Sequence, residues 1–185
     1  MSRRTTVSLA APADPAEGAA APLLRGLAPA VPPHCRLLVL GSFPSVASLQ
    51  AQQYYAHPRN QFWRLVGDVF GVDLLALPYA RRIELVNARG LGIWDVYAHC
   101  RRQGSLDSAI CDAQFNDLPG LVARLPALRV IAHNGGESAR ALRITRRLGP
   151  QVLRLPSTSP ANASWSLQRK YAAWRAAFLA AGLLT

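Results

Sequence analysis

Four consecutive apolar residues, Leu37–Leu40, end abruptly at Gly41. An uninterrupted apolar run of this length is typical of a β-strand that is covered on both faces. Further strands are expected at 92–97, 128–132 and 151–155, which are mostly apolar with one or two polar residues each, and segments with helical spacing separate them. Because strands that alternate with helices form parallel sheets with helices on both sides, we expect an α/β fold. The predicted architecture is a three-layer αβα sandwich with a small central four-stranded parallel sheet.

Helix boundaries can be placed from capping and breaking residues. Gly71 and Gly90 follow two segments of helical spacing, and Ser105–Ser108 resembles a helix N-cap. The expected helices cover residues 60–70, 79–87, 118–125, 137–148 and 165–181.

Length and composition limit the number of domains and the kind of partner. The chain of 185 residues, 50% of them hydrophobic, can bury one core but is too short for two domains of ordinary size. Residues 1–26 are rich in alanine and proline, so we expect a flexible tail there and a single domain over 27–185. The formal charge of +11, carried almost wholly by arginine, favours a phosphate-bearing partner, although genome composition can produce the same bias.

Membrane, metal and disulfide chemistry find little support in the sequence. No apolar stretch is long enough to span a membrane and no export signal follows Met1, so we expect a cytoplasmic protein. Cys35, Cys100 and Cys111 are too few and too irregularly spaced for a disulfide framework or a four-cysteine metal site. His99 beside Cys100 lacks a second ligand pair. We therefore expect no metal and no cofactor.

Polar residues follow three of the four expected strands. They lie in Gly41-Ser-Phe-Pro-Ser45, His133-Asn134 and Ser157-Thr-Ser-Pro-Ala-Asn162. The carboxyl ends of parallel strands meet at one edge of a sheet, so these loops should converge on a single crevice. The segment 54–63 adds aromatic rings and amide groups. Such groups suit a planar, hydrogen-bonding ligand such as a nucleobase.

Taken in order, these motifs resemble the uracil-DNA glycosylase superfamily, specifically its hypoxanthine-DNA (deoxyinosine) glycosylase branch. The first motif of that branch, Gly-Ser-x-Pro-Ser, corresponds to Gly41–Ser45, and its aromatic pair followed by Pro-Arg-Asn-x-Phe-Trp corresponds to 54–63. Ala56–Trp63 is also similar to the mismatch-specific uracil branch. The resemblance covers about residues 27–182, and three ordered motifs are far more specific than one. It implies a DNA repair enzyme that hydrolyses the N-glycosidic bond of a flipped-out deaminated base, hypoxanthine first and uracil second.

The resemblance also implies which residues read the base. Asn134 matches the base-reading asparagine, because a carboxamide can pair with the keto oxygen and adjacent N–H of a deaminated base. Adenine and cytosine present the reverse order and would leave buried polar atoms unpaired. Tyr55 matches the stacking aromatic, although Tyr54 can exchange roles with it, and Asn134 can instead cap a helix. The other implied base-binding residues are Gly41, Ser42, Phe43 and Ser45, where Ser45 leaves room for a purine and Phe43 narrows it.

Catalysis is assigned by the same resemblance to Asn60, together with Asn134. Better-known branches position water with an Asp or Asn of the first motif, but Phe43 occupies that place here. The water-positioning role therefore moves to Asn60, which can also cap the following helix. A carboxamide is a very weak base, so we expect a dissociative mechanism in which hydrogen-bond donors stabilise the departing base. The backbone near Ser42 and the Asn134 amide are the candidate donors.

DNA contacts are implied for the last loop. Several relatives have a histidine and a large apolar wedge there, where this chain has Ser157 and Ala161. Arg169 and Lys170 are either phosphate contacts or solvated charges. Asp95 and Asp107 are the carboxylates near strand ends that could do acid–base work, but neither has a partner at an obvious spacing, so both are interpreted as capping residues. The expected DNA-binding residues are Ser157, Ser159, Pro160, Ala161, Asn162 and Arg59.

These assignments imply a monofunctional, metal-independent glycosylase that acts as a monomer on DNA in the nucleoid. The chain's single lysine, Lys170, lies outside the proposed site, which disfavours Schiff-base chemistry. One alternative is a uracil or mismatch-specific DNA glycosylase. A second is a non-catalytic, basic DNA-binding module that kept the pocket but lost turnover, and a third is a nucleoside or nucleotide hydrolase.

Overall fold

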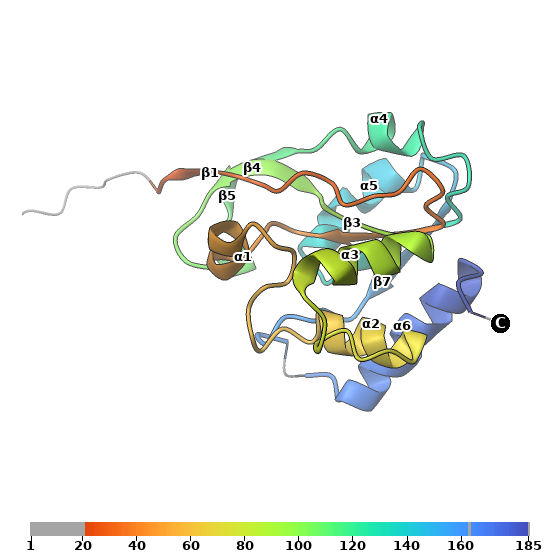
Figure 1. Ribbon diagram of the computed structural model, residues 1–185. Helices are drawn as coiled ribbons and strands as arrows, with labels where there is room; N and C mark the ends of the chain where they lie inside the picture. Colours follow the sequence, from red (N-terminus) through yellow and green to blue (C-terminus); the bar gives the residue numbers. More distant parts are fainter. Residues whose placement is uncertain (1–20, 163, 185) are drawn as a thin grey trace, which may run out of the picture.

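A four-stranded parallel sheet forms the centre of the molecule (Figure 1). The computed structural model describes residues 21–162 and 164–184. The sheet has the strand order β3-β2-β6-β7, as predicted in type and strand number. Leu37 to Leu40 of β2 are fully buried because this strand lies between two others. The strands are β2 (Leu37–Gly41), β3 (Leu91–Asp95), β6 (Val130–Asn134) and β7 (Gln151–Leu155).

Helices cover both faces of this sheet, which confirms the three-layer architecture. Figure 1 shows α2 and α6 on one side of the sheet and α4 and α5 on the other. None of the helices in the described part of the chain has the length and apolarity needed to cross a bilayer. The helices are α1 (Val46–Ala51), α2 (Phe62–Phe70), α3 (Tyr79–Ala88), α4 (Leu118–Val122), α5 (Leu142–Thr145) and α6 (Leu167–Ala180), with 3₁₀ turns η1 (Asp107–Ala109) and η2 (Ser138–Ala141).

A second, antiparallel sheet was not predicted. It consists of β1 (Leu23–Arg25), β4 (Tyr97–Arg101) and β5 (Cys111–Phe115) in the order β1-β4-β5. The apolar run expected to form one strand over 92–97 therefore divides at Val96 into β3 and β4, which belong to different sheets.

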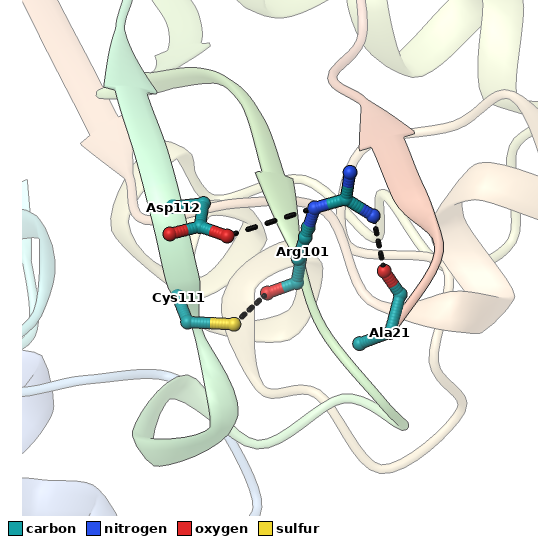
Figure 2. A network of polar contacts seen from close by, with 4 residues as sticks. All are labelled: Ala21, Arg101, Cys111 and Asp112. Atoms are coloured by element: carbon teal, nitrogen blue, oxygen red, sulfur yellow. Dashed lines mark hydrogen bonds and ion pairs between the residues drawn. The ribbon is translucent and has the colours of Figure 1, made fainter. Parts of the chain in front are cut away.

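The boundary of the expected flexible tail at residue 26 is wrong. Leu23–Arg25 pairs with β4, and the Arg101 side chain donates a 2.8 Å hydrogen bond to the Ala21 carbonyl (Figure 2). Arg101 also faces Asp112 of β5 at 3.6 Å, so its side chain links β5 to the residues just before β1. A three-residue strand is too short to produce a periodic pattern, and for this reason the sequence did not reveal it. The rest of the expected tail, residues 1–20, lies outside the described residues.

Two further expectations about local structure need correction. The helix expected over 137–148 is instead η2 followed by the short α5. Its Ser138 and Thr145 hydroxyls each lie 2.9 Å from a ring nitrogen of His133, which ties the segment to β6 at two points. Ser105 was expected to cap a helix, but its hydroxyl accepts a hydrogen bond from the backbone N–H of Val46 at 3.0 Å. That bond holds the unpredicted helix α1.

Candidate active site

A cavity of about 680 Å³ opens at the carboxyl ends of the four parallel strands. It is the crevice that the strand-end rule predicts. Arg59 and Pro160 are the two predicted site residues that do not line it. The predicted residues that the structure brings together around it are Gly41, Ser42, Phe43, Ser45, Tyr55, Asn60, Asn134, Ser157, Ser159, Ala161 and Asn162.

A larger hollow of about 860 Å³ lies elsewhere, lined by α2, the residues that follow it and the start of α6. Its wall includes Trp63, Leu74 and Tyr171 and contains none of the predicted site residues. A catalytic or recognition site needs convergent polar groups, and these lie in the cavity at the strand ends. We therefore take that cavity as the candidate site.

The carboxamide of Asn134 is held in one orientation at the end of β6. Its Oδ1 accepts a hydrogen bond from the backbone N–H of Thr158 at 2.9 Å, and an N–H can donate only to oxygen here. Its Nδ2 donates to the Thr158 hydroxyl at 2.9 Å and, over a longer 3.3 Å, to the Tyr55 hydroxyl. Asn134 therefore fastens the last loop to the sheet and does not cap the following η2, which begins after Glu137 without a side-chain cap.

The two tyrosines of the aromatic segment have different surroundings. Tyr54 is 4% exposed, and its hydroxyl donates to the Ala28 carbonyl at 2.9 Å, so it anchors the chain in the core. Tyr55 has a left-handed backbone, with φ of 56°, and its ring stacks on Phe62 with centroids 3.9 Å apart. Burial raises the pKa of the Tyr55 hydroxyl, so this group stays neutral. Stacking on Phe62 holds the Tyr55 ring at the cavity wall.

Asn60 lies at the cavity wall just before α2. Its Oδ1 accepts a hydrogen bond from the backbone N–H of Phe62 at 2.9 Å, which satisfies one free donor of the first helical turn. The N-cap of α2 is Gln61, so Asn60 supports the helix start from one residue before the N-cap position. A carbonyl oxygen has two lone pairs, so Oδ1 keeps one acceptor site for a water molecule.

The last loop is stiffened by its own hydrogen bonds. The Ser157 and Ser159 hydroxyls accept from backbone N–H groups two residues later, and the Asn162 side chain donates to the Ser157 carbonyl at 3.0 Å. Lys170 is only 1% exposed, and its Nζ donates to the Asn162 carbonyl at 3.0 Å and to Gln61 Oε1 at 2.9 Å. Lys170 is therefore an internal clamp between this loop and α2, and a phosphate contact in this position is excluded by its burial.

Two polar residues in the cavity wall were not predicted as site residues. Thr158 is fully buried and holds Asn134, as described above. Asp95 ends β3, is 4% exposed and lines the cavity, and its Oδ2 has no hydrogen-bond partner. Burial raises the pKa of Asp95 to about 7. The strand-end rule would have found Asp95, but the expected strand continued to Tyr97 and placed Asp95 inside it.

Asp107 also lines the cavity, although it was interpreted as a capping residue. Its Oδ1 accepts a 2.6 Å hydrogen bond from the Ser42 hydroxyl, which fixes the first strand-end loop. Within the described residues, no group of three or more His, Cys, Asp or Glu side chains is arranged to hold a metal ion.

Trp165 is an exposed aromatic residue on the cavity rim. It lies between the last loop and α6, is 40% exposed and contributes to the cavity wall. The Arg169 guanidinium lies 5.0 Å from the centre of its ring. An exposed indole with a cation on one face is suited to stack against a nucleobase.

Comparisons with known proteins agree with this arrangement. The family model described as the uracil DNA glycosylase superfamily matches residues 28–180. Two curated relatives are named hypoxanthine DNA glycosylase. The one from Methanosarcina acetivorans is 38% identical over 154 residues, and the one from Methanosarcina barkeri is 35% identical over 154 residues. Each alignment covers 83% of this chain and 97% of the relative.

A solved structure has the same fold. It is a solution NMR structure of a protein from Methanosarcina acetivorans described as a candidate uracil DNA glycosylase, with a TM-score of 0.78 and 37% sequence identity. The match covers 87% of this chain and 98% of the solved one. The three ordered motifs, the parallel sheet and the cavity at its strand ends thus have a common explanation: the chain belongs to the uracil DNA glycosylase superfamily.

Proposed function

We propose that this glycosylase removes hypoxanthine from DNA by hydrolysing the N-glycosidic bond of a flipped-out deoxyinosine. The observation that carries the proposal is the Asn134 carboxamide, which is locked by Thr158 at the wall of a cavity large enough for a purine. Its relatives named hypoxanthine DNA glycosylase support the same substrate.

Base recognition follows from the hydrogen bonds that Asn134 still has available. Thr158 occupies one lone pair of Oδ1 and one N–H of Nδ2, so the second lone pair is open. The second N–H makes only the long 3.3 Å bond to Tyr55, which a ligand can replace. Hypoxanthine presents an N–H to Oδ1 and a keto oxygen to Nδ2, so it would compete with Thr158 and Tyr55 for these atoms. Adenine presents an amino group and an unprotonated ring nitrogen, so it would leave these buried groups unpaired, at a cost of about 1–3 kcal/mol each.

Water addition is assigned to Asn60. The free lone pair of its Oδ1 can orient a water molecule, while the Phe62 N–H holds the side chain in place. Asn60 is too weak a base to remove a proton from water early, so C1′–N bond cleavage runs ahead of water attack.

DNA binding is assigned to the last loop, Arg59 and the rim of the cavity. Ser157 and Ser159 can approach phosphates, whereas Ala161 is too small to fill the space that a flipped base leaves. We assign that filling role to Trp165, because it is the exposed aromatic side chain on the cavity rim. The net charge of +11 supplies the general attraction for DNA.

Three further properties are part of the proposal. The enzyme acts on DNA as a monomer, needs no metal and carries no lyase activity. The last property is supported by Lys170, whose Nζ is buried and engaged by Asn162 and Gln61. A Schiff base requires an accessible amine.

The proposed function is tested by release of hypoxanthine from an end-labelled inosine duplex in EDTA, read as alkali-dependent strand breaks. We expect breaks with the wild type and a loss of about 10²-fold or more with Asn60→Ala. Asn87→Ala is the matched control, because Asn87 lies in α3 outside the cavity wall. A duplex with uracil is run beside it. Strand breaks in the uracil duplex alone would show that the substrate is uracil and not hypoxanthine. Binding to DNA without strand breaks would show that the protein is a non-catalytic DNA-binding module.

A further inference from the structure

The carboxyl group of Asp95 is a buried polar group in the cavity wall that has no role in the proposed mechanism. It stands at the carboxyl end of the edge strand β3, directly beside Gly41 of β2. It is 4% exposed, and its Oδ2 has no hydrogen-bond partner. An ionised carboxylate in such a place would be costly, whereas a neutral carboxylic acid can donate a hydrogen bond to a ligand.

Gly41 explains how this carboxyl group reaches the base-binding groups. A Cβ atom at position 41 would lie 2.2 Å from Asp95 Oδ1, so only glycine leaves space for the carboxyl group. The same point lies 3.4 Å from the Tyr55 hydroxyl, which in turn accepts from Asn134. Asp95, Tyr55 and Asn134 therefore converge over the end of β2, at the wall where the base would lie.

The charged and titratable groups around Asp95 favour its protonated form. Burial raises its pKa, the charge of Asp107 raises it further, and the guanidinium of Arg102 lowers it, with a result of about 7. Arg102 is 1% exposed and donates to the Pro44 carbonyl. Tyr54, Tyr55 and Tyr79 also face Asp95, and burial keeps their hydroxyls neutral. A substantial fraction of Asp95 thus carries a proton at neutral pH.

We propose that Asp95 is a catalytic acid that gives its proton to the departing hypoxanthine. This inference rests on the proposed function. As the C1′–N9 bond breaks, its electron pair goes to the base, and the Asp95 proton moves to N7, so hypoxanthine leaves as a neutral molecule. Water then adds to C1′ and loses one proton, which returns to the Asp95 carboxylate directly or through solvent.

The proton donor gives the site a preference for purines. N7 is an acceptor that every purine has and that uracil lacks. An unprotonated hypoxanthine would depart as an anion, and a positioned acid lowers that barrier by a factor of about 10²–10⁴. The acid and Asn134 have separate tasks: Asn134 reads the identity of the base, and Asp95 assists its departure.

The first test is the pH dependence of single-turnover hypoxanthine release by the wild type and Asp95→Asn. We expect the wild-type rate to fall as the pH rises through about 7, because the acid loses its proton. In Asp95→Asn we expect a rate that is lower by about 10²-fold at pH 6 and no longer falls through this range. Asp112→Asn is the matched control, since Asp112 lies on β5 with a 73% exposed side chain and should keep the wild-type profile (Figure 2).

The second test uses the wild type alone, so it holds even if the variant folds poorly. In a duplex with 7-deazainosine the proton has no acceptor at position 7, and we expect a slow rate without the fall above pH 7. An inosine rate that rises with pH would make Asp95 a base, and equal pH profiles for inosine and 7-deazainosine would also overturn the inference. If the wild type releases no hypoxanthine at any pH, the proposed function itself fails.

Discussion

At the scale of single residues, the proposed specificity of this glycosylase depends on the orientation of the Asn134 carboxamide. Asn134 Oδ1 accepts hydrogen bonds and Nδ2 donates them, and Thr158 contacts both atoms, with its backbone N–H and its hydroxyl. A base-reading asparagine that could rotate by half a turn would accept adenine as readily as hypoxanthine. In the proposed recognition of the base, Thr158 is therefore as important as Asn134.

The first prediction concerns this lock. Thr158→Val keeps the shape and the backbone bond but removes the hydroxyl acceptor, so one Asn134 N–H loses its partner. We expect the ratio of hypoxanthine to adenine release to fall by about tenfold, the equivalent of roughly 1.4 kcal/mol. Thr158→Ser retains the hydroxyl and serves as the control. Equal ratios for both variants and the wild type would show that Asn134 needs no lock.

At the scale of elements, the last loop is held in place by hydrogen bonds to α6 and to the start of α2. Lys170 on α6 connects the Asn162 carbonyl with Gln61 at the start of α2, and the Gln61 N–H donates to the Thr158 carbonyl at 3.0 Å. The loop that carries Thr158 is thus attached to α2 and α6 as well as to the sheet. This attachment places Trp165 at the cavity rim, directly before Ser166, the N-cap of α6.

The second prediction tests this rim. Trp165→Ala removes the ring that would fill the gap in the duplex, so we expect weaker binding to inosine DNA by about 1–3 kcal/mol and slower release. Trp165→Phe keeps a smaller aromatic face and should recover part of the loss. Fluorescence of 2-aminopurine beside the inosine measures base flipping directly. Unchanged flipping in Trp165→Ala would assign the filling role to another residue.

The elements also show where sequence reasoning succeeds. The buried strands β2 and β6 were predicted because apolar runs identify strands covered on both faces. The edge strand β7 was also predicted, although it is only partly buried. The strands β1 and β5 were missed because both are short, and β5 is mostly exposed. Within the site, local motifs predicted Asn60, Tyr55 and Asn134, and the structure places all three in the cavity wall, while their catalytic and base-binding roles stay predictions. Thr158 was missed because its contact with Asn134 joins segments that are distant in the sequence. Asp95 was missed because the expected strand continued past it to Tyr97.

At the scale of the whole molecule, two buried groups give opposite dependences of stability on pH. Burial lowers the pKa of His133 to about 4. Between about pH 6.5 and 4, His133 is therefore protonated in the unfolded chain but neutral in the folded chain. His133 therefore costs stability as the pH falls from about 6.5 toward 4. Asp95 has a raised pKa of about 7, so the folded chain keeps a proton that the unfolded chain releases. Asp95 costs stability as the pH rises from about 4 to 7.

The third prediction follows from this opposition. Asp95→Asn removes the loss of stability that Asp95 causes as the pH rises. The free energy of unfolding of the variant should therefore increase relative to that of the wild type between pH 4 and pH 7. We expect the gain to be on the order of 2 kcal/mol or more and to level off above pH 7. Urea unfolding at four pH values measures it. A difference that stays constant with pH would mean that Asp95 is ionised in the folded protein.

The cysteines offer one practical consequence of the unpredicted second sheet. Cys35 and Cys100 are buried, and burial raises both thiol pKa values, that of Cys35 to about 12, so neither should react with an electrophilic dye. Cys111 on β5 is exposed. A maleimide fluorophore should therefore attach at Cys111 of the unmodified sequence, close along the chain to Asp107 in the cavity wall. Such a label would let single molecules be followed as they scan DNA.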